Sequence, residues 1–177
     1  MATLQQRLAR GDPGAFAELY DACAGRVGHY LMVYLGSRAD AEDALQETFW
    51  RLARNKRKLA RVDNLTAYVF TVARNEAARL AKRKTRRQRE PLPLTGEELF
   101  CEASNDLDAE LRETAETVAV ALAQLTAELR EVVELKTYGE LTFQQISAVT
   151  GLPQGTVASR YRTAVMQMQR WFARQPR

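Results

Sequence analysis

The sequence predicts an all-α protein made of two small helical domains joined by an acidic linker. Apolar residues repeat at the three-to-four residue spacing of helices, and strand-length alternation is not found. Only nine glycines and five prolines occur in 177 residues, too few for a β protein with many turns. A turn-rich stretch from residue 90 separates two helical blocks. We expect a helical bundle of about four helices over residues 10–90, a linker over 91–112 and a four-helix domain over 113–177.

Local signals place the helices of the first block. The pair Asp12-Pro13 is a good helix start, with an aspartate cap and a proline in the first turn. In the helix expected from Asn64 onward, Glu76 interrupts the apolar stripe, so we expect the inward face of that helix to narrow there. Further helices are expected over Arg26–Leu35, over Ala41–Ala53 after a cap at Ser37 or Asp40, and from Asn64 into a basic tract.

The second block ends in a helix-turn-helix pattern. The segment Thr142–Gln145 has the spacing of a capping box, and Gly151-Leu152-Pro153 interrupts two amphipathic segments. Upstream, helical spacing runs through Val118, Leu122 and Leu125 and again from Thr126 to Gly139. In the last helix we expect Val157, Tyr161, Val165, Met168 and Phe172 to face Ile146, Val149 and Leu152.

Charge is distributed unevenly although the formal net charge is only +4. Residues 74–89 hold eight lysines and arginines against one acid, and residues 95–116 hold eight acids against one arginine. This asymmetry predicts a nucleic-acid surface beside an acidic connector. Cys23 and Cys101 are too few and too far apart for a metal cluster or disulfide framework, so we expect reduced thiols and neither metal nor cofactor.

The sequence predicts a cytoplasmic protein without membrane insertion. Apolar runs stay below the roughly 20 residues that cross a bilayer. The first twelve residues, MATLQQRLARGD, lack the hydrophobic core of a secretion signal.

The polar side of the last helix is the first predicted DNA-binding surface. Short polar groups near a helix start can approach bases, arginines bind phosphates or guanine, and a helix N-terminus offers free N–H groups to phosphate. An ordinary helical hairpin with a solvated basic face is the alternative. The predicted contact residues are Gln154, Thr156, Ser159, Arg160, Arg162 and Thr163.

These motifs resemble bacterial extracytoplasmic-function (ECF) sigma factors of the sigma-70 family. The carboxy-terminal match includes Gly151-Leu152-Pro153, Gly155-Thr156-Val157 and Ser159-Arg160, after an upstream helix at Leu125–Val133. The amino-terminal match includes Asp40–Phe49, typical of the family's polymerase-binding segment. Asn64–Tyr68 with Ala73-Arg74-Asn75 resembles the part that contacts the promoter −10 element. Two motifs in the expected order make coincidence improbable.

The resemblance implies that the chain binds core RNA polymerase, through its clamp and flap regions, and promoter DNA. Acids, an amide and an aromatic on one helix suit a partner that supplies arginines and would repel DNA. An acidic face that is simply solvated is the alternative. The resemblance assigns polymerase binding to Asp43, Gln46, Glu47 and Trp50.

The resemblance also implies that the −10 element is bound as opened single strand. Aromatic stacking is worth roughly 1–3 kcal/mol per base, and Tyr68 stands where the family usually has tryptophan. A core position at the helix start is an equally good interpretation of Tyr68. The predicted −10 contacts are Asn64, Tyr68, Arg74, Asn75, Arg79, Lys82 and Arg83.

Two departures from the family pattern concern the −35 element, which the last helix is expected to contact. Ala158 and Thr163 stand where relatives commonly carry lysine or arginine, so duplex binding should be weak and its salt dependence shallow. The acidic linker, which holds Glu97 and Glu98, is expected either to imitate RNA in the polymerase exit channel or to be a solvated tether. As in many relatives, an anti-sigma protein is expected to mask the chain.

Two other function classes compete with a sigma factor. A polymerase-independent helix-turn-helix transcription regulator would share the C-terminal motif but would not need the face around Gln46 and Glu47. An enzyme is rejected because His29 is the only histidine and has no neighbouring nucleophile or metal-ligand spacing. No catalytic residue is predicted, and nucleotidyl transfer is assigned to the polymerase.

Overall fold

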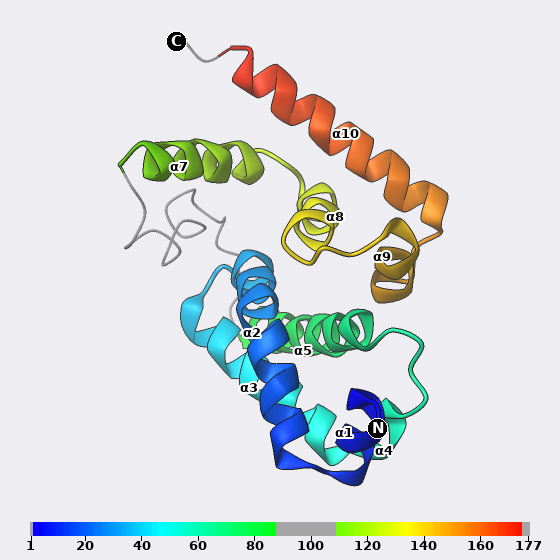
Figure 1. Ribbon diagram of the computed structural model, residues 1–177. Helices are drawn as coiled ribbons and strands as arrows, with labels where there is room; N and C mark the ends of the chain where they lie inside the picture. Colours follow the sequence, from blue (N-terminus) through cyan, green and yellow to red (C-terminus); the bar gives the residue numbers. More distant parts are fainter. Residues whose placement is uncertain (1, 88–108, 175–177) are drawn as a thin grey trace.

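The computed structural model describes residues 2–87 and 109–174 and is all-α over these ranges (Figure 1). Within them nine helices are present and strands are absent, which confirms the predicted fold class. Five helices, α1–α5, form an N-terminal bundle, and four helices, α7–α10, form a C-terminal bundle. The stretch predicted as the acidic linker lies mostly outside the described residues, as does Cys101.

The N-terminal bundle has one long helix where the sequence predicted two. The helix α2 runs unbroken through Gly25 and Gly28, so the prediction of a separate helix starting at Arg26 was wrong. A helical glycine costs only about 1 kcal/mol relative to alanine, and the buried stripe that includes Leu19 and Val27 outweighs it. The bundle consists of α1 (Leu4–Arg10), α2 (Pro13–Leu35), α3 (Arg38–Arg54), α4 (Lys56–Leu59) and α5 (Leu65–Arg87).

Side-chain caps fix the ends of these helices. Asp12 accepts from the amides of Gly14 and Ala15, and Ser37 accepts from that of Asp40, so both predicted caps are present. Gly36 ends α2 in the left-handed conformation at φ 62°. The sequence did not predict α1, which Thr3 opens with a capping box and which buries Leu8 completely.

The C-terminal bundle contains the predicted helix-turn-helix. Thr142 and Gln145 form the expected capping box at the start of α9, and Gly151 ends that helix at φ 74°. Phe172 does not face the core as predicted, because α10 extends past the rest of the bundle and leaves this ring 38% exposed. The helices are α7 (Ala109–Ala123), α8 (Ala127–Thr137), α9 (Phe143–Thr150) and α10 (Gln154–Phe172).

The two bundles share one hydrophobic core. Buried residues of α2 and α5 are continuous with Val132 and Leu135 of α8 and with Ile146 and Val149 of α9. As a result, α8 packs beside α2 and α9 beside α5 (Figure 1). A smaller cluster joins Leu122 of α7 to Ala164 of α10. None of the described helices combines the length and hydrophobicity needed to cross a bilayer.

Candidate functional site

The outward face of α3 carries the acidic surface that the sequence predicted. Ala41, Ala44, Thr48 and Leu52 are buried against the bundle, so the helix turns its other side to solvent. Trp50 is 54% exposed, and the guanidinium carbon of Arg54 lies 5.1 Å from the centre of its ring. Asp43 and Gln46 are exposed, and Glu47 is half-buried. Helical spacing therefore presents two carboxylates, an amide and an indole together.

This face forms one wall of a groove, and α5 forms the other. The groove has a volume of about 570 Å³ and is lined by Asp43, Gln46, Glu47 and Trp50 of α3 and by Arg79, Leu80 and Arg83 of α5. The sequence assigned the α3 residues to polymerase and the two arginines to DNA, on separate surfaces. That separation does not hold for Arg79 and Arg83, which face the same groove as the acids.

A buried carboxylate connects the two walls. Glu76 of α5 is 1% exposed, and its Oε1 atom lies 2.7 Å from Nε of Arg51 on α3. Its Oε2 atom accepts a hydrogen bond from Nε of Arg79 at 2.9 Å and lies 2.7 Å from Nη2 of the same guanidinium. Glu47 Oε1 adds contacts of 3.2 Å to Arg51 Nε and 3.8 Å to Arg79 Nη2. The sequence predicted a narrowed stripe at Glu76, whereas the residue is buried because two guanidinium groups neutralise it.

The start of α5 forms a second, smaller cavity of about 130 Å³ on the other side of Arg51. Tyr68 and Asn75 line it from α5, and Asn55 and Lys58 line it from the α3–α4 segment. Tyr68 also packs against the core, so both of its predicted roles are compatible with this position. Asn64 caps α5 by accepting from the amide of Ala67 at 2.7 Å.

On α10 the predicted polar face is turned away from the bundle. Gln154, Ser159 and Arg162 are exposed, while Thr156, Arg160 and Thr163 are half-buried. Ser159 donates its hydroxyl to the carbonyl of Thr156 at 2.9 Å, and Thr163 donates to that of Ser159 at 3.0 Å. Both hydroxyl protons are used within the helix in this state, which leaves the oxygen lone pairs to accept hydrogen bonds from outside.

The turn before α10 is fixed by side-chain bonds. Ser147 donates to the carbonyl of Leu152 at 2.5 Å, and Thr150 accepts from the Leu152 amide at 3.4 Å. The ring of Phe143 packs against that of Tyr161 with centroids 5.5 Å apart. These contacts hold the first turn of α10 in a fixed orientation relative to α9, as a helix that enters a DNA groove requires.

Comparison with known proteins gives a consistent result over both bundles. A family model described as Sigma-70 region 2 matches residues 19–87, and one described as Sigma-70, region 4 matches residues 115–168. The ECF RNA polymerase sigma factor RpoE of Cereibacter sphaeroides is 32% identical over 161 residues, which cover 87% of this chain and 84% of the relative. The chain belongs to the ECF sigma factors of the sigma-70 family.

Other relatives and solved folds agree. The ECF RNA polymerase sigma factor SigL of Mycobacterium tuberculosis is 31% identical over 158 residues, 89% of this chain and 88% of the relative. The sigma factor RpoE of Bartonella quintana, solved with the anti-sigma factor NepR, has a TM-score of 0.70 at 19% identity, covering 91% of this chain and 98% of that one. CnrH, solved with the cytosolic domain of CnrY, has a TM-score of 0.67 at 19% identity, covering 98% and 97%.

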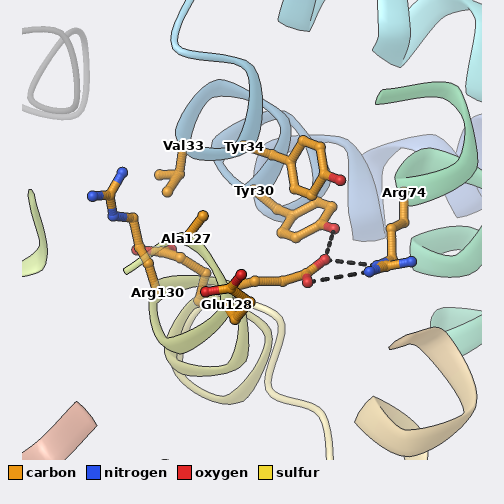
Figure 2. Close-up of a pocket in the computed structure, with 9 residues that line it drawn as sticks. Tyr30, Val33, Tyr34, Arg74, Ala127, Glu128 and Arg130 are labelled. Atoms are coloured by element: carbon orange, nitrogen blue, oxygen red, sulfur yellow. Dashed lines mark hydrogen bonds and ion pairs between the residues drawn. The ribbon is translucent and has the colours of Figure 1, made fainter. Parts of the chain in front are cut away.

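In this sigma factor one predicted −10 contact is used inside the protein. Arg74 Nε and Nη2 donate to the carboxylate of Glu131 on α8 at 2.7 and 3.3 Å, and Tyr30 of α2 donates to the same carboxylate at 2.9 Å (Figure 2). Burial, and then the nearby Glu131 charge, raises the pKa of Tyr30 well above its usual value. The hydrogen bond to Glu131 likewise raises the pKa of Arg74. Lys82 and Arg83, in contrast, are exposed.

Further polar contacts surround that site between the bundles. Arg26 Nη1 lies 2.7 Å from Glu140 Oε2, and His29 Nε2 lies 3.1 Å from Oε2 of the fully buried Glu134. The His29 ring stacks on Tyr138 at 3.8 Å. The histidine is a helix residue, as the sequence predicted. A cavity of about 360 Å³, lined by Tyr30, Tyr34 and Arg74 among others, adjoins the hydrogen bonds between Tyr30, Arg74 and Glu131 (Figure 2).

Sequence reasoning missed Arg130 as a structural residue of the C-terminal bundle. This arginine is 8% exposed and donates to three backbone carbonyls, those of Leu122, Ala123 and Leu125, at 2.9 to 3.0 Å. It thereby supplies donors to carbonyls at the end of α7 and in the turn that follows, where helical partners run out. An arginine inside the apolar pattern of α8 was the available signal. Among the described side chains, groups of histidine, cysteine and acids that could hold a metal ion are absent.

Proposed function

We propose that this sigma factor binds core RNA polymerase through the α3 face and directs promoter-specific initiation of transcription. The observation that carries the proposal is the outward display of Asp43, Gln46, Glu47 and Trp50 on the same chain as a helix-turn-helix. Carboxylates on a rigid helix attract a partner that carries arginines and repel DNA. Polymerase supplies the nucleotidyl-transfer chemistry, so the chain itself acts as a non-enzymatic factor in the cytoplasm.

Two modules divide the promoter between them in this proposal. Residues 10–90 bind polymerase and the −10 element, 91–112 connect, and 113–177 bind the −35 element. On α5 the exposed cations Arg79, Lys82 and Arg83 suit the phosphate backbone, and the cavity beside Tyr68 and Asn75 suits an unstacked base. On α10 the exposed Gln154, Ser159 and Arg162 suit the major groove.

An anti-sigma protein is the proposed regulator. Bartonella quintana RpoE, which has the same fold, was solved in complex with the anti-sigma factor NepR. The present chain packs its own bundles together and engages Arg74 with Glu131, so a partner that favours this closed arrangement would keep a −10 contact occupied. Regulation by a protein that binds across both bundles follows from that arrangement.

The test is transcription by purified core polymerase on a randomised promoter library. Wild-type protein is expected to select one promoter class, and Gln46→Ala/Glu47→Ala is expected to lose both transcription and capture of the core enzyme. Glu42→Gln, which removes a charge from the exposed Arg38–Glu42 pair on the same helix, is the matched control and should retain both. Tight binding to a palindromic duplex without polymerase would instead support an independent helix-turn-helix regulator.

A further inference from the structure

Glu76 has a buried charge that neither predicted surface explains. It is 1% exposed, and burying an ionised carboxylate is costly unless cations neutralise it. Arg51 reaches it from α3 and Arg79 reaches it from α5, so its two oxygens join the two walls of the groove. The apolar stripe of α5 could hold an aliphatic side chain here without any partner.

The contacts of Glu76 fix the orientation of Arg79. The Nε group of Arg79 donates to Glu76 Oε2 at 2.9 Å, and Nη2 forms an ion pair with the same oxygen at 2.7 Å. The Arg79 side chain is 45% exposed and lines the groove, where Nη2 lies 3.8 Å from Glu47 Oε1. The same Nη2 atom of Arg79 therefore lies between Glu76, which anchors it, and Glu47, a predicted polymerase-binding acid.

Glu47 consequently belongs both to the predicted polymerase-binding face and to the ion-pair cluster around Glu76. Its Oε1 atom contacts both Arg51 and Arg79, and Glu76 holds both of these arginines. While Glu47 has no external partner, its charge offsets that of Arg79 and weakens the attraction of Arg79 for phosphate. When an external cation pairs with Glu47, that offset is reduced, and Arg79 remains anchored with donors directed into the groove.

We propose that Glu76 is a positioning residue that couples polymerase binding at Glu47 to DNA binding at Arg79. The inference rests on the proposed function and adds a link between its two interfaces. Binding of a polymerase arginine or lysine to Glu47 raises the affinity of Arg79 for the −10 strand. Linkage requires that DNA at Arg79 strengthen polymerase binding by the same factor.

The experiment measures that factor directly. The affinity of the full-length chain for a forked duplex carrying the selected −10 sequence is determined with and without core polymerase, and the ratio is the coupling factor. Glu76→Gln is expected to lower this ratio about fivefold or more, within the range typical of coupled sites. Arg79→Gln should lower it similarly, and the double variant should lower it no further, because both changes break the same link.

Matched controls separate coupling from folding. Glu42→Gln removes a charge of the same sign from α3 outside the groove and should leave the ratio unchanged. A Glu76→Gln variant that melts at a lower temperature but keeps the wild-type ratio would show a merely structural role and overturn the inference. If Glu76→Gln does not fold, Glu47→Gln is measured instead. Without polymerase, Glu47→Gln should raise the affinity for DNA severalfold in the wild-type background but not in the Arg79→Gln background. An equal rise in both backgrounds would overturn the inference.

Failure of the proposed function gives a different result. Wild-type protein that never binds core polymerase would refute the sigma-factor activity itself. Wild-type protein that initiates transcription, with a coupling factor insensitive to Glu76 and Glu47, would refute only this link.

Discussion

Replacing Glu131 by glutamine should release the two bundles from each other. Glu131 accepts three hydrogen bonds across the interface, one from Tyr30 and two from Arg74. Glutamine keeps a similar shape but loses the charge, and its amide group presents N–H where a carboxylate oxygen accepted. The variant therefore leaves the Arg74 guanidinium without a counter-ion and weakens the partner of a buried tyrosine.

The size of the effect follows from burial. The Glu131 side chain is 10% exposed and that of Arg74 is 27% exposed. Exposed pairs contribute about 0–1 kcal/mol, while breaking a fully buried pair costs about 3–5 kcal/mol. An intermediate value of about 2 kcal/mol fits this site, because water can reach Arg74 through the adjoining cavity. Since 1.4 kcal/mol is a factor of ten, the ratio of open to closed molecules should rise about 30-fold.

Small-angle X-ray scattering of the full chain and amide exchange in α9, which packs on α5, measure this opening. Glu131→Gln should enlarge the radius of gyration and speed exchange in α9, while the circular dichroism of the helices changes little. Glu128→Gln removes the same charge one turn earlier on α8, from an exposed side chain, and is the matched control. Equal opening in both variants, or none in Glu131→Gln, would refute the reasoning.

Three further predictions concern stability, pH and DNA. Arg130→Met should lower the free energy of unfolding by about 2–4 kcal/mol in urea titrations, because the carbonyl of Leu122 and its neighbours lose a charged donor. The pKa of Tyr30 is raised in the folded protein, so its contribution to stability is complete below the pKa of about 10 that tyrosine has in the unfolded chain. That contribution is lost as the pH rises from there toward the pKa of the folded state. Tyr30→Phe should therefore reduce the fall in melting temperature at alkaline pH. Arg162→Ala should reduce the salt slope of −35 duplex binding by about 0.9 without lowering the melting temperature, because the side chain is exposed.

Helix ends were predictable from the sequence where a local side-chain bond defines them. Asp12, Ser37 and the Thr142–Gln145 box act within four residues of the chain, so their types and spacing suffice. The separate helix expected from Arg26 was wrong, because a helix passes through such a position when a buried face continues beyond it. That condition is tertiary: α2 continues because Cys23 and Val27 pack into the shared core.

The candidate site was predictable only in part, for the same reason. Helical spacing alone places Gln46 and Glu47 outward on α3, and the structure agrees. It does not show that Arg79 of α5 meets them, because the groove depends on how two helices cross. Nor does a lone acid in an apolar stripe indicate its partners, so Glu76 was identified as an interruption rather than as an ion-pair centre.

The closed arrangement predicts an order for the two proposed binding events. The groove on α3 opens to solvent, with Trp50 54% exposed, so polymerase can reach this face while the bundles remain packed. In the same state the Nε and Nη2 donors of Arg74 are occupied by Glu131 and are not available to DNA. On the proposed function we therefore expect polymerase docking to precede full contact with the −10 element, with separation of α8 from α5 between the two steps. A variant locked closed by a disulfide across α5 and α9 should still capture core enzyme in a pull-down yet fail to open promoter DNA, and efficient opening by that locked chain would contradict this order.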